Sequence, residues 1–437
     1  MSHDASPQHS TRTSRRSFLK AGALAAAAGS VPIARSAHAA GDDTLKVGLV
    51  GCGGRGTGAA VNALSADPNT KITALADAFE GRLPSTRAAL QKREPDRVDV
   101  PDDRCFAGFD GYQKVIDSGV DVVLLASTPH FRPEHLKACV DAGKHVFCEK
   151  PMAVDAPGVR SVMASAEVAE QKGLNIVSGF CWRYHPAVQA TMQQVLDGAI
   201  GDVLCMQETY LTGTLWHRGR RPDDTEMTYQ MRNWYYFDWL SGDFNTEQHV
   251  HSLDKGSWAM GDRPPVRAWG LGGRQVRTEQ PKWGNIYDHH AVVYEYDNGA
   301  RMYAYCRQQA GAYSDVSDLF IGTKGRADIL GHRITGETDW RYDGPGGNMY
   351  ELQHVALFKA IRDGEPINDG HFMAVSTMLG VLGRMVDYTG QAITWDQALN
   401  SEQLLAPESY AWDADPPVLP DEEGRYPVAL PGVTPFV

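Results

Sequence analysis

The feature that most constrains this chain is a glycine-rich turn between an apolar run and a helix-compatible run. The apolar run covers residues 45–50, the glycines follow as Gly51-x-Gly53-x-x-Gly56, and the helical run covers residues 59–64. This is the context that the dinucleotide-binding fingerprint requires. Gly51 allows a tight turn, Gly53 lets the backbone approach a pyrophosphate, and Gly56 lets the helix pack closely on the strand. The stretch therefore predicts a nucleotide site at a helix N-terminus.

The glycine pattern alone is weak, because a chain with 44 glycines produces such spacings by chance. A second apolar run, residues 72–76, strengthens it by ending in Asp77, about twenty residues beyond Gly56, where a ribose-binding carboxylate is expected. Asp77 should accept both ribose hydroxyls and repel a 2′-phosphate. No arginine follows Asp77 directly, and Arg82 stands farther along the chain. The sequence therefore predicts NAD as cofactor, with NADP less favoured.

Strand and helix patterns alternate up to residue 180. The run at residues 121–126 is almost purely apolar, which is typical of a strand covered on both faces. This rhythm predicts a Rossmann domain with a doubly wound parallel sheet over residues 44–180. The further elements expected here are helices at 84–93, 110–116, 133–143 and 155–172, and strands at 145–148 and 174–178.

Beyond residue 180 the pattern changes to longer strand candidates. Asp297-Asn298-Gly299 predicts a hairpin turn between two of them. We expect a second, α+β domain at residues 181–395 with a large, mostly antiparallel open sheet, followed by an extended tail at residues 396–437. Its expected strands are 203–211, 266–270, 291–296, 301–306 and 319–322, and its expected helices are 186–196, 350–362 and 374–389.

The first 39 residues differ from the rest. Ser14-Arg15-Arg16-Ser17-Phe18-Leu19-Lys20 precedes a weakly apolar segment, residues 21–33, and Ala37-His38-Ala39 offers a small-residue cleavage site. This order of basic, apolar and small residues predicts a twin-arginine export signal at residues 1–39 and a periplasmic or otherwise exported protein. That route carries folded proteins, which suits a protein that binds its nucleotide before export.

Charge and cysteine usage exclude several other classes. The formal net charge is −12, and no basic tract interrupts the acidic body, which argues against nucleic acid or anionic membrane as partner. The body contains no apolar run long enough to span a membrane. The seven cysteines (52, 105, 139, 148, 181, 205 and 306) are scattered and lack any C-x-x-C pair. They predict buried thiols rather than disulfides or a zinc site.

A distinctive segment follows the strand at 145–148. Ser127 to His130 sits at the carboxyl end of a predicted strand, where α/β sheets place ligands, and the run Ala142-Gly-Lys-His-Val-Phe-Cys-Glu-Lys-Pro151 comes next. Together with the glycine turn and Asp77, this order resembles the Gfo/Idh/MocA oxidoreductases, named for glucose–fructose oxidoreductase and inositol dehydrogenase. The resemblance covers roughly residues 44–395.

The resemblance implies hydride transfer at a carbinol carbon of sugars, cyclitols or related polyols, and an open sheet that often forms oligomers, here a dimer or tetramer. It also implies that Lys150 lies beside nicotinamide and substrate, where a cation stabilises developing alkoxide charge. The cofactor-binding residues expected are Gly51, Gly53, Gly54, Arg55, Gly56, Asp77, Thr128, Pro129, His130, Glu149 and Lys150.

A second family motif, usually with Asp and His four apart and a further Asp three beyond, matches the segment that ends in Asp254. The match places His251 at the catalytic histidine and Glu247 at the carboxylate, where the family usually has Asp. If the segment is helical, Glu247 and His251 share a face while His249 points elsewhere. Histidine titrates near neutrality, so His251 can take a hydroxyl proton as hydride leaves carbon.

Two further clusters need interpretation. Glu247, His249, His251 and the Asp288-His289-His290 run are numerous enough to suggest a metal, but the two helical histidines cannot share a face and the other two are adjacent on a strand. No metal is therefore predicted. A sugar-stacking aromatic wall is predicted from the runs Trp182-Arg183-Tyr184-His185 and Arg232-Asn233-Trp234-Tyr235-Tyr236, although Trp234 and Tyr235 can equally be core residues. The substrate residues expected are Arg183, Tyr184, Trp234, Tyr235 and His251.

Three functions remain open from the sequence. The first is an exported NAD(P)-dependent oxidoreductase with a tightly held cofactor, acting on a sugar, cyclitol or glycoside. The second is an NAD-dependent glycosidase that oxidises a sugar transiently and eliminates the glycosidic bond, for which Tyr184, His185 or Glu247 could serve as base. The third is a non-catalytic sugar- or nucleotide-sensing protein, against which Lys150 and His251 argue.

Overall fold

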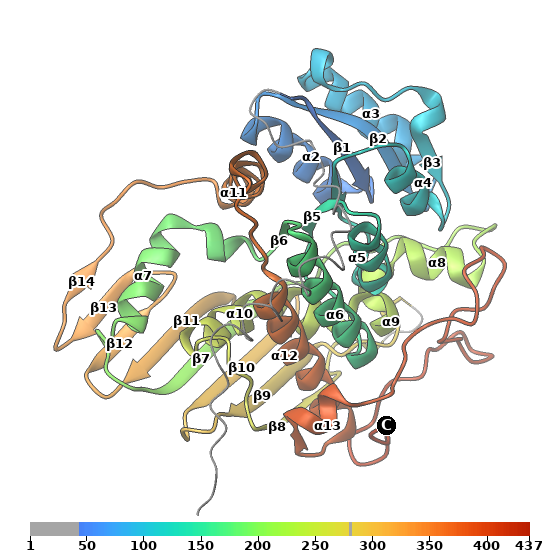
Figure 1. Cartoon of the computed structure of the whole chain (residues 1–437). Coiled ribbons are helices and arrows are strands. Elements are labelled where there is room, and N and C mark those ends of the chain that lie inside the picture. Colours follow the sequence, from blue (N-terminus) through green and yellow to red (C-terminus); the bar gives the residue numbers. More distant parts are fainter. Residues whose placement is uncertain (1–42, 279–281) are drawn as a thin grey trace, which may run out of the picture. The chain divides into compact units, whose positions relative to one another are not determined.

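The first sheet of the computed structural model has six parallel strands in the order β3-β2-β1-β4-β5-β6 (Figure 1). The winding direction reverses between β1 and β4, and in such sheets ligands bind outside the carboxyl ends of the strands at this point. The structure describes residues 43–278 and 282–437, so the predicted export signal lies outside the described residues. The strands are β1 (Leu45–Val50), β2 (Thr70–Asp77), β3 (Cys105–Ala107), β4 (Val122–Leu125), β5 (His145–Cys148) and β6 (Ile176–Ser178).

Helices connect these strands close to where the sequence predicts them. β4 is buried along its whole length, which explains its continuous apolar run. Asp155 caps α6, since its carboxylate accepts a hydrogen bond from the Gly158 amide at 2.8 Å. The helices are α2 (Gly54–Ala66), α3 (Arg82–Arg93), α4 (Gly111–Asp117), α5 (Arg132–Asp141) and α6 (Ala156–Lys172), with short 3₁₀ turns at Pro95–Arg97, Asp102–Arg104, Pro129–Phe131 and Cys181–Tyr184.

The second sheet has nine strands in the order β14-β13-β12-β11-β7-β10-β9-β8-β15. The β7–β10 pair is parallel and the other pairs are antiparallel, so the predicted mostly antiparallel sheet is confirmed. Sequence analysis missed the four shortest strands, because two to four residues are too few to show a period. The strands are β7 (Val203–Thr212), β8 (Arg267–Gly273), β9 (His289–Glu295), β10 (Arg301–Gln308), β11 (Asp315–Gly322), β12 (Gly325–Asp328), β13 (Arg333–Gly336), β14 (Trp340–Arg341) and β15 (Ile393–Thr394).

One face of this sheet is covered by helices and the other is open. Burial alternates along β10, where Met302 and Ala304 are buried while Tyr303 is exposed, as the period of a strand requires. Figure 1 shows α10 and α12 over the covered face. The helices of this part are α7 (Pro186–Leu196), α8 (Glu226–Arg232), α9 (Asp238–Ser241), α10 (Val250–Ala259), α11 (Met349–Asp363), α12 (Gly370–Thr389) and α13 (Trp395–Leu399), with a 3₁₀ turn at Trp234–Tyr236 and a π-helix at Asn245–His249.

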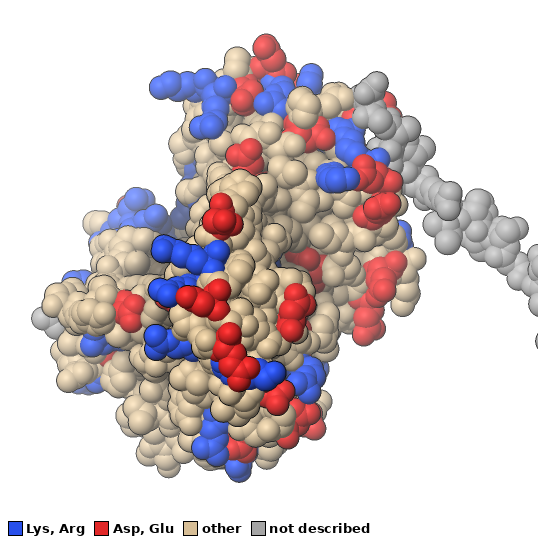
Figure 2. Space-filling view, turned by 90° about the vertical axis from the view of Figure 1, so that its left-hand side faces the viewer, with Lys and Arg blue, Asp and Glu red and all other residues tan. Residues whose placement is uncertain are grey.

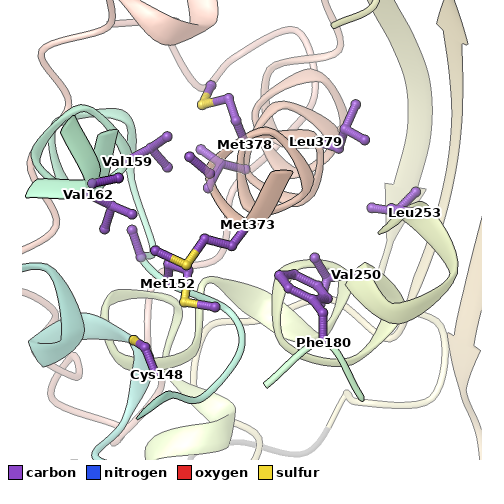
Figure 3. Packing of buried hydrophobic residues seen from close by; sticks show 14 of the residues in the cluster. Cys148, Met152, Val159, Val162, Phe180, Val250, Leu253, Met373, Met378 and Leu379 are labelled. Carbon is purple, nitrogen blue, oxygen red and sulfur yellow. The ribbon is translucent and has the colours of Figure 1, made fainter. Parts of the chain in front are cut away.

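Helix α12 joins the two sheets into one core. It is apolar nearly all round and is buried over almost all of its 20 residues, as expected for a helix with protein on every side. Figure 3 shows Met373, Met378 and Leu379 of α12 packed between Val159 of α6 and Leu253 of α10. The domain that carries the predicted nucleotide site and the domain that carries the predicted histidine are therefore held by a common hydrophobic cluster.

The chain ends in an extended segment that we call the C-terminal strap (residues 400–437). It contains no helix or strand, as predicted, but the predicted tail at residues 396–437 begins inside α13. The sequence signal for α13 is the capping box formed by Thr394 and Gln397.

The surface charges, the helices and the cysteines can be compared with what the composition predicts. The face in Figure 2 carries Lys and Arg interspersed with Asp and Glu. Within residues 43–278 and 282–437, every helix is too short or too polar to cross a membrane. The seven cysteines are free thiols, and five of them are buried as predicted, whereas Cys105 and Cys205 are half-buried.

Candidate active site

A cavity of about 670 Å³ opens at the carboxyl ends of β1, β2 and β4 and reaches residues of the second domain. Its size is that of a cofactor or ligand site. The first domain contributes the glycine turn, Asp77 and the segment around Lys150, and the second domain contributes Glu247 and His251. Both predicted motifs therefore face one cavity.

The glycine turn has the geometry that a pyrophosphate needs. Gly51 has φ +99°, and a Cβ there would lie 2.5 Å from the backbone of Ala126. A Cβ on Gly56 would lie 1.8 Å from the Gly51 carbonyl oxygen, so only glycine fits at either position. The first turn of α2 carries no acidic residue and starts at the cavity, where its free amides can bind an anion. The turn fits a dinucleotide.

Asp77 is oriented by the backbone at the end of β2. Its carboxylate accepts hydrogen bonds from the Cys52 amide at 2.7 Å and the Phe79 amide at 2.8 Å, and it keeps lone pairs for ribose hydroxyls. Arg82, which stands farther along the chain than Asp77, is close to it in the structure, with its Nη1 3.6 Å from Asp77 Oδ2. Arg82 offsets part of the negative charge on which the predicted preference for NAD rests.

Lys150 follows β5 and points at the second domain. Its ammonium lies 3.0 Å from Glu247 Oε1 and also donates to the backbone carbonyl of Glu247. The adjacent Glu149 accepts from Arg55 Nε at 2.5 Å. Two ion pairs, Arg55–Glu149 and Lys150–Glu247, therefore line the inner part of the cavity.

His251 lines the same cavity at the start of α10. Burial lowers the pKa of its imidazole well below the ordinary value, and Lys150, Lys255 and Arg55 lower it further. The ring is therefore neutral at pH 7 and can accept a proton. Lys255 fixes the backbone here, donating to the His251 carbonyl at 2.7 Å while it pairs with buried Asp318 at 3.1 Å.

The π-helix at Asn245–His249 precedes α10, so Glu247 and His251 reach the cavity through a widened turn rather than the regular helix expected. As expected, Glu247 and His251 face the same cavity, whereas His249 points elsewhere. His249 is buried, and its Nδ1 lies 3.0 Å from Asn245 Oδ1.

A buried polar cluster anchors the start of this segment. His290 on β9 lies between Asp387 of α12, at 2.9 Å, and Asp243, at 3.2 Å, and Tyr388 donates to Asp243 at 2.7 Å. Although burial lowers it, the charges and hydrogen bonds of Asp243 and Asp387 raise the pKa of His290 to about 9. Protonated His290 therefore ties the turn before Glu247 to the sheet and to α12.

The same contacts account for the residues considered as metal ligands. His290 and His249 bond within the core, and His289 Nδ1 lies 2.7 Å from Asp288 Oδ1. Across residues 43–278 and 282–437, the His, Cys, Asp and Glu side chains form no group of three placed to hold a metal ion.

Several predicted site residues lie elsewhere than expected. Arg183 is buried in ion pairs with Asp254, at 2.9 Å, and Asp262, at 2.6 Å, because two carboxylates from α10 and its end surround it. Tyr184 donates to Asp369 at 2.6 Å. Both side chains are structural contacts of the second domain, and neither lines the cavity.

The predicted aromatic wall and strand-end residues are also corrected in part. Tyr235 is buried, and its hydroxyl bonds to Gln248 at 3.1 Å and to Gln308 at 2.7 Å, so it is core, whereas Trp234 lines the cavity. Thr128 lines the cavity, but Pro129 begins a 3₁₀ turn outside its lining and His130 Nε2 bonds to the Tyr410 hydroxyl at 2.7 Å.

The structure also places residues at the cavity that sequence analysis missed. They come from loops, a strand end, the π-helix and the starts of two helices, whose positions depend on tertiary contacts, and no local pattern marks them. They are Tyr210, Trp216, Arg218, Gln248 and Tyr350 from the second domain, and Phe79, Phe109 and Arg132 from the first.

A parallel doubly wound domain whose glycine turn, carboxylate and lysine share a cavity with a neutral histidine from a second domain is an arrangement suited to a nicotinamide nucleotide bound beside a reacting group. Residues 45–180 match the family model GFO_IDH_MocA, described as an oxidoreductase family with an NAD-binding Rossmann fold. The first domain is therefore similar to the NAD-binding Rossmann domain of that family, and the family model matches about a third of the chain.

Individual proteins and solved structures are also similar to this chain. Inositol 2-dehydrogenase 1 of Saccharopolyspora erythraea is 32% identical over 160 residues, 36% of this chain and only 43% of that protein. Myo-inositol 2-dehydrogenase of Thermotoga maritima is 24% identical over 335 residues, 74% of this chain and 90% of that protein. The structure of a levoglucosan dehydrogenase with NADH and levoglucosan matches with a TM-score of 0.62 at 17% identity, over 80% of this chain and 99% of that one. At that identity the structural match shows the shared fold.

Proposed function

We propose that this protein is an NAD-dependent oxidoreductase that transfers hydride between a tightly held nicotinamide cofactor and a carbinol carbon of a sugar, cyclitol or glycoside. The observation that carries the proposal is that Lys150 and His251, from different domains, line the cavity that also contains the glycine turn and Asp77. The relatives named for inositol and levoglucosan support a polyol or sugar as substrate.

The residues divide the chemistry between them. The cofactor, when bound, supplies the hydride acceptor. Neutral His251 takes the hydroxyl proton as the carbinol carbon loses hydride and becomes a carbonyl. Lys150 stabilises the negative charge that develops on the reacting oxygen, and its pairing with Glu247 holds the ammonium in the cavity.

Contacts of the C-terminal strap support the tight hold on the cofactor. Trp412 packs against Phe79 and Phe109, with ring centroids 4.8 Å away in each case, and these two phenylalanines line the cavity beside Asp77. Tyr410 packs on Phe109 as well, at 5.9 Å. The strap therefore backs the wall against which the adenosine half of the cofactor would lie.

The strap is also fastened to both domains. Its Leu405 amide donates to Asp155 of the first domain at 2.9 Å, and its Val418 carbonyl accepts from Gln230 of α8 at 2.6 Å. Opening the adenosine side of the cavity would break these contacts, so slow release of the cofactor is expected.

The glycosidase alternative has less support. It needs a base for the proton beside the transient ketone, and Tyr184 and His185 lie outside the cavity lining, in contacts with Asp369 and His332. Glu247 lines the cavity but is ion-paired with Lys150. The sensing alternative would leave the Lys150–His251 arrangement without a use.

We also propose export by the twin-arginine route and assembly into a dimer or tetramer. The order of residues 1–39 supports export, and fractionation of the producing cell with and without the Arg15-Arg16 pair tests it. The open face of the nine-stranded sheet supports assembly, since Leu271, Tyr303 and Ile321 are 67%, 40% and 41% exposed on it. Light scattering of Tyr303→Glu against the unaltered protein tests that interface.

The proposed activity is tested with the full-length protein purified without added nucleotide. Released nucleotide is identified by mass, and the retained nucleotide is followed spectroscopically while inositols, sugars and sugar acids are added singly. NAD(H) that copurifies and changes redox state with one of these compounds supports the proposal. Loss of all nucleotide on dialysis would contradict the tight hold, and retained NAD that no carbinol reduces would contradict the activity.

A further inference from the structure

Two arginines that line the cavity, Arg218 and Arg132, have no acidic partner within 4 Å among the described residues, and of these Arg218 is exposed whereas Arg132 is buried. Arg132 is the first residue of α5, is 5% exposed and lines the cavity. Its Nη1 donates to the Pro151 carbonyl at 2.6 Å, whereas among the described residues neither Nε nor Nη2 has an acceptor, and Nε is enclosed. Buried donors without acceptors are uncommon in native proteins and destabilising. This part of the cavity is therefore built to receive an acceptor from a ligand.

The local charge also leaves Arg132 unbalanced. Arg55 is neutralised by Glu149 at 2.5 Å and Lys150 by Glu247 at 3.0 Å. The third acid of the cavity, Asp77, lies 3.6 Å from Arg82, so Arg132 adds one buried positive charge that no carboxylate within 4 Å offsets among the described residues. A buried, unpaired charge is costly. A ligand with one negative charge would remove that cost.

The free edge of the guanidinium indicates what kind of anion. Nε and Nη2 of Arg132 project their N–H bonds side by side, and this pair matches the two oxygens of a carboxylate. Nη1 is already used by Pro151, which fixes the plane of the guanidinium. A bidentate carboxylate would satisfy the enclosed Nε and the remaining nitrogen together.

The position of Arg132 favours the substrate over the cofactor as the source of that anion. Its fixed hydrogen bond is to the residue that directly follows Lys150, the proposed stabiliser of the reacting oxygen. The pyrophosphate is expected instead at the glycine turn, where α2 begins. An anion held on Arg132 would therefore lie in the cavity that Lys150 and His251 also line, next to the segment that carries Lys150.

We infer that Arg132 binds the carboxylate of an acidic sugar, an aldonate or a uronate, and thereby orients a carbinol of the same molecule toward Lys150 and His251. The inference names the substrate class of the proposed reaction and rests on that proposal for the reaction, although the binding of the acid can be measured without any turnover.

Calorimetry on the full-length protein with its retained nucleotide tests the inference, with D-gluconate, D-glucuronate, D-glucose and glucose 6-phosphate as probes. We expect at least one acid to bind tenfold or more tightly than glucose. Arg132→Gln should abolish this difference while nucleotide content stays unchanged. Arg132→Lys, which keeps the charge but not the paired donors, should retain part of it. The exposed Arg326→Gln, which removes one positive charge far from the site, should retain all of it.

The inference would be overturned if glucose bound as tightly as both acids, or if glucose 6-phosphate bound more tightly than both. It would also be overturned if Arg132→Gln and Arg132→Lys kept their melting temperature but lost the nucleotide as well as the preference for acids. Acid binding that depends on Arg132 but never reduces the retained nucleotide supports the inference and contradicts the proposed function. Reduction of the retained nucleotide by neutral sugars, with no preference for acids in binding, supports the proposed function and contradicts the inference.

Discussion

The two walls of the cavity are built in different ways. The first domain presents its residues on strand ends and tight turns, where Gly51 and Gly56 leave no room for another side chain and Asp77 is held by two backbone amides. The second domain presents Glu247 and His251 on a π-helix and the start of α10, which buried ion pairs hold in place. Backbone geometry fixes one wall, and buried charge fixes the other.

This difference predicts different responses to substitution. Changes in the first wall should act on cofactor binding and leave the second domain folded. Changes in the second wall should act on turnover where they touch the cavity and on stability where they touch the buried clusters beneath it. The substitutions below separate these effects, beginning with the largest.

Removing the catalytic groups should have the largest effect. We expect Lys150→Ala and His251→Ala each to lower turnover roughly 10²–10⁴-fold, since each removes a group that handles the proton or charge of the reacting oxygen. Nucleotide content should barely change, because neither side chain lies at the glycine turn. Steady-state rates and nucleotide content are measured beside His371→Ala, an exposed histidine outside the cavity lining. Near-normal turnover in His251→Ala together with loss in His249→Ala would show that the assignment of the catalytic histidine is wrong.

Asp77→Asn should narrow the preference for NAD over NADP by about tenfold or more. A charge-assisted hydrogen bond to ribose is worth about 1.5–3 kcal/mol, and its loss leaves Arg82 free to attract a 2′-phosphate. Dissociation constants of the two nucleotides for stripped protein provide the measurement, with exposed Glu80→Gln as the charge control. Tighter binding of NADP by the unaltered protein would contradict the predicted preference.

Trp412→Ala should speed release of the nucleotide by about tenfold. The substitution removes two aromatic contacts, each worth about 0.5–1.5 kcal/mol beyond its buried area. The loss of nucleotide during timed dilution is compared with Leu419→Ala, which changes an exposed strap residue. Equal release rates in the two variants would show that the strap does not retain the cofactor.

The His290 cluster should give the smallest effect, visible as a pH dependence of stability. Because the folded-state pKa of His290 is raised from 6.5 to about 9, its stabilisation is fully present below pH 6.5 and is lost as the pH rises to about 9. The difference in melting temperature between the unaltered protein and His290→Gln should therefore shrink over that range. His371→Gln should show no such trend, and a constant difference for His290→Gln would mean that the ring is not charged.

The sequence predicts the first wall far better than the second. Gly51, Asp77 and Lys150 each occupy a position defined by local order along the chain, so the turn, strand end and following lysine could be placed without tertiary information. Pro129 and His130 were the exceptions, because Pro129 begins a 3₁₀ turn outside the cavity lining and the His130 ring bonds to Tyr410 of the strap.

In the second domain, residue type alone was a poor guide. Arg183, Tyr184 and Tyr235 are typical sugar-binding residues, but each bonds to a buried partner that is remote in sequence or hidden in a neighbouring strand. Arg132 could not be identified from the sequence either, but for the opposite reason. Its importance comes from the acidic partner that it lacks, and only the folded arrangement shows this.

The most direct test of the central claim follows the retained NAD in the purified protein when a chromogenic glycoside is added without any electron acceptor. We expect stoichiometric reduction of the bound NAD, no release of the aglycone, and no reduction in Lys150→Ala. Sustained release of the aglycone in deuterated water, with deuterium incorporated next to the oxidised carbon, would contradict this claim and establish the glycosidase cycle instead.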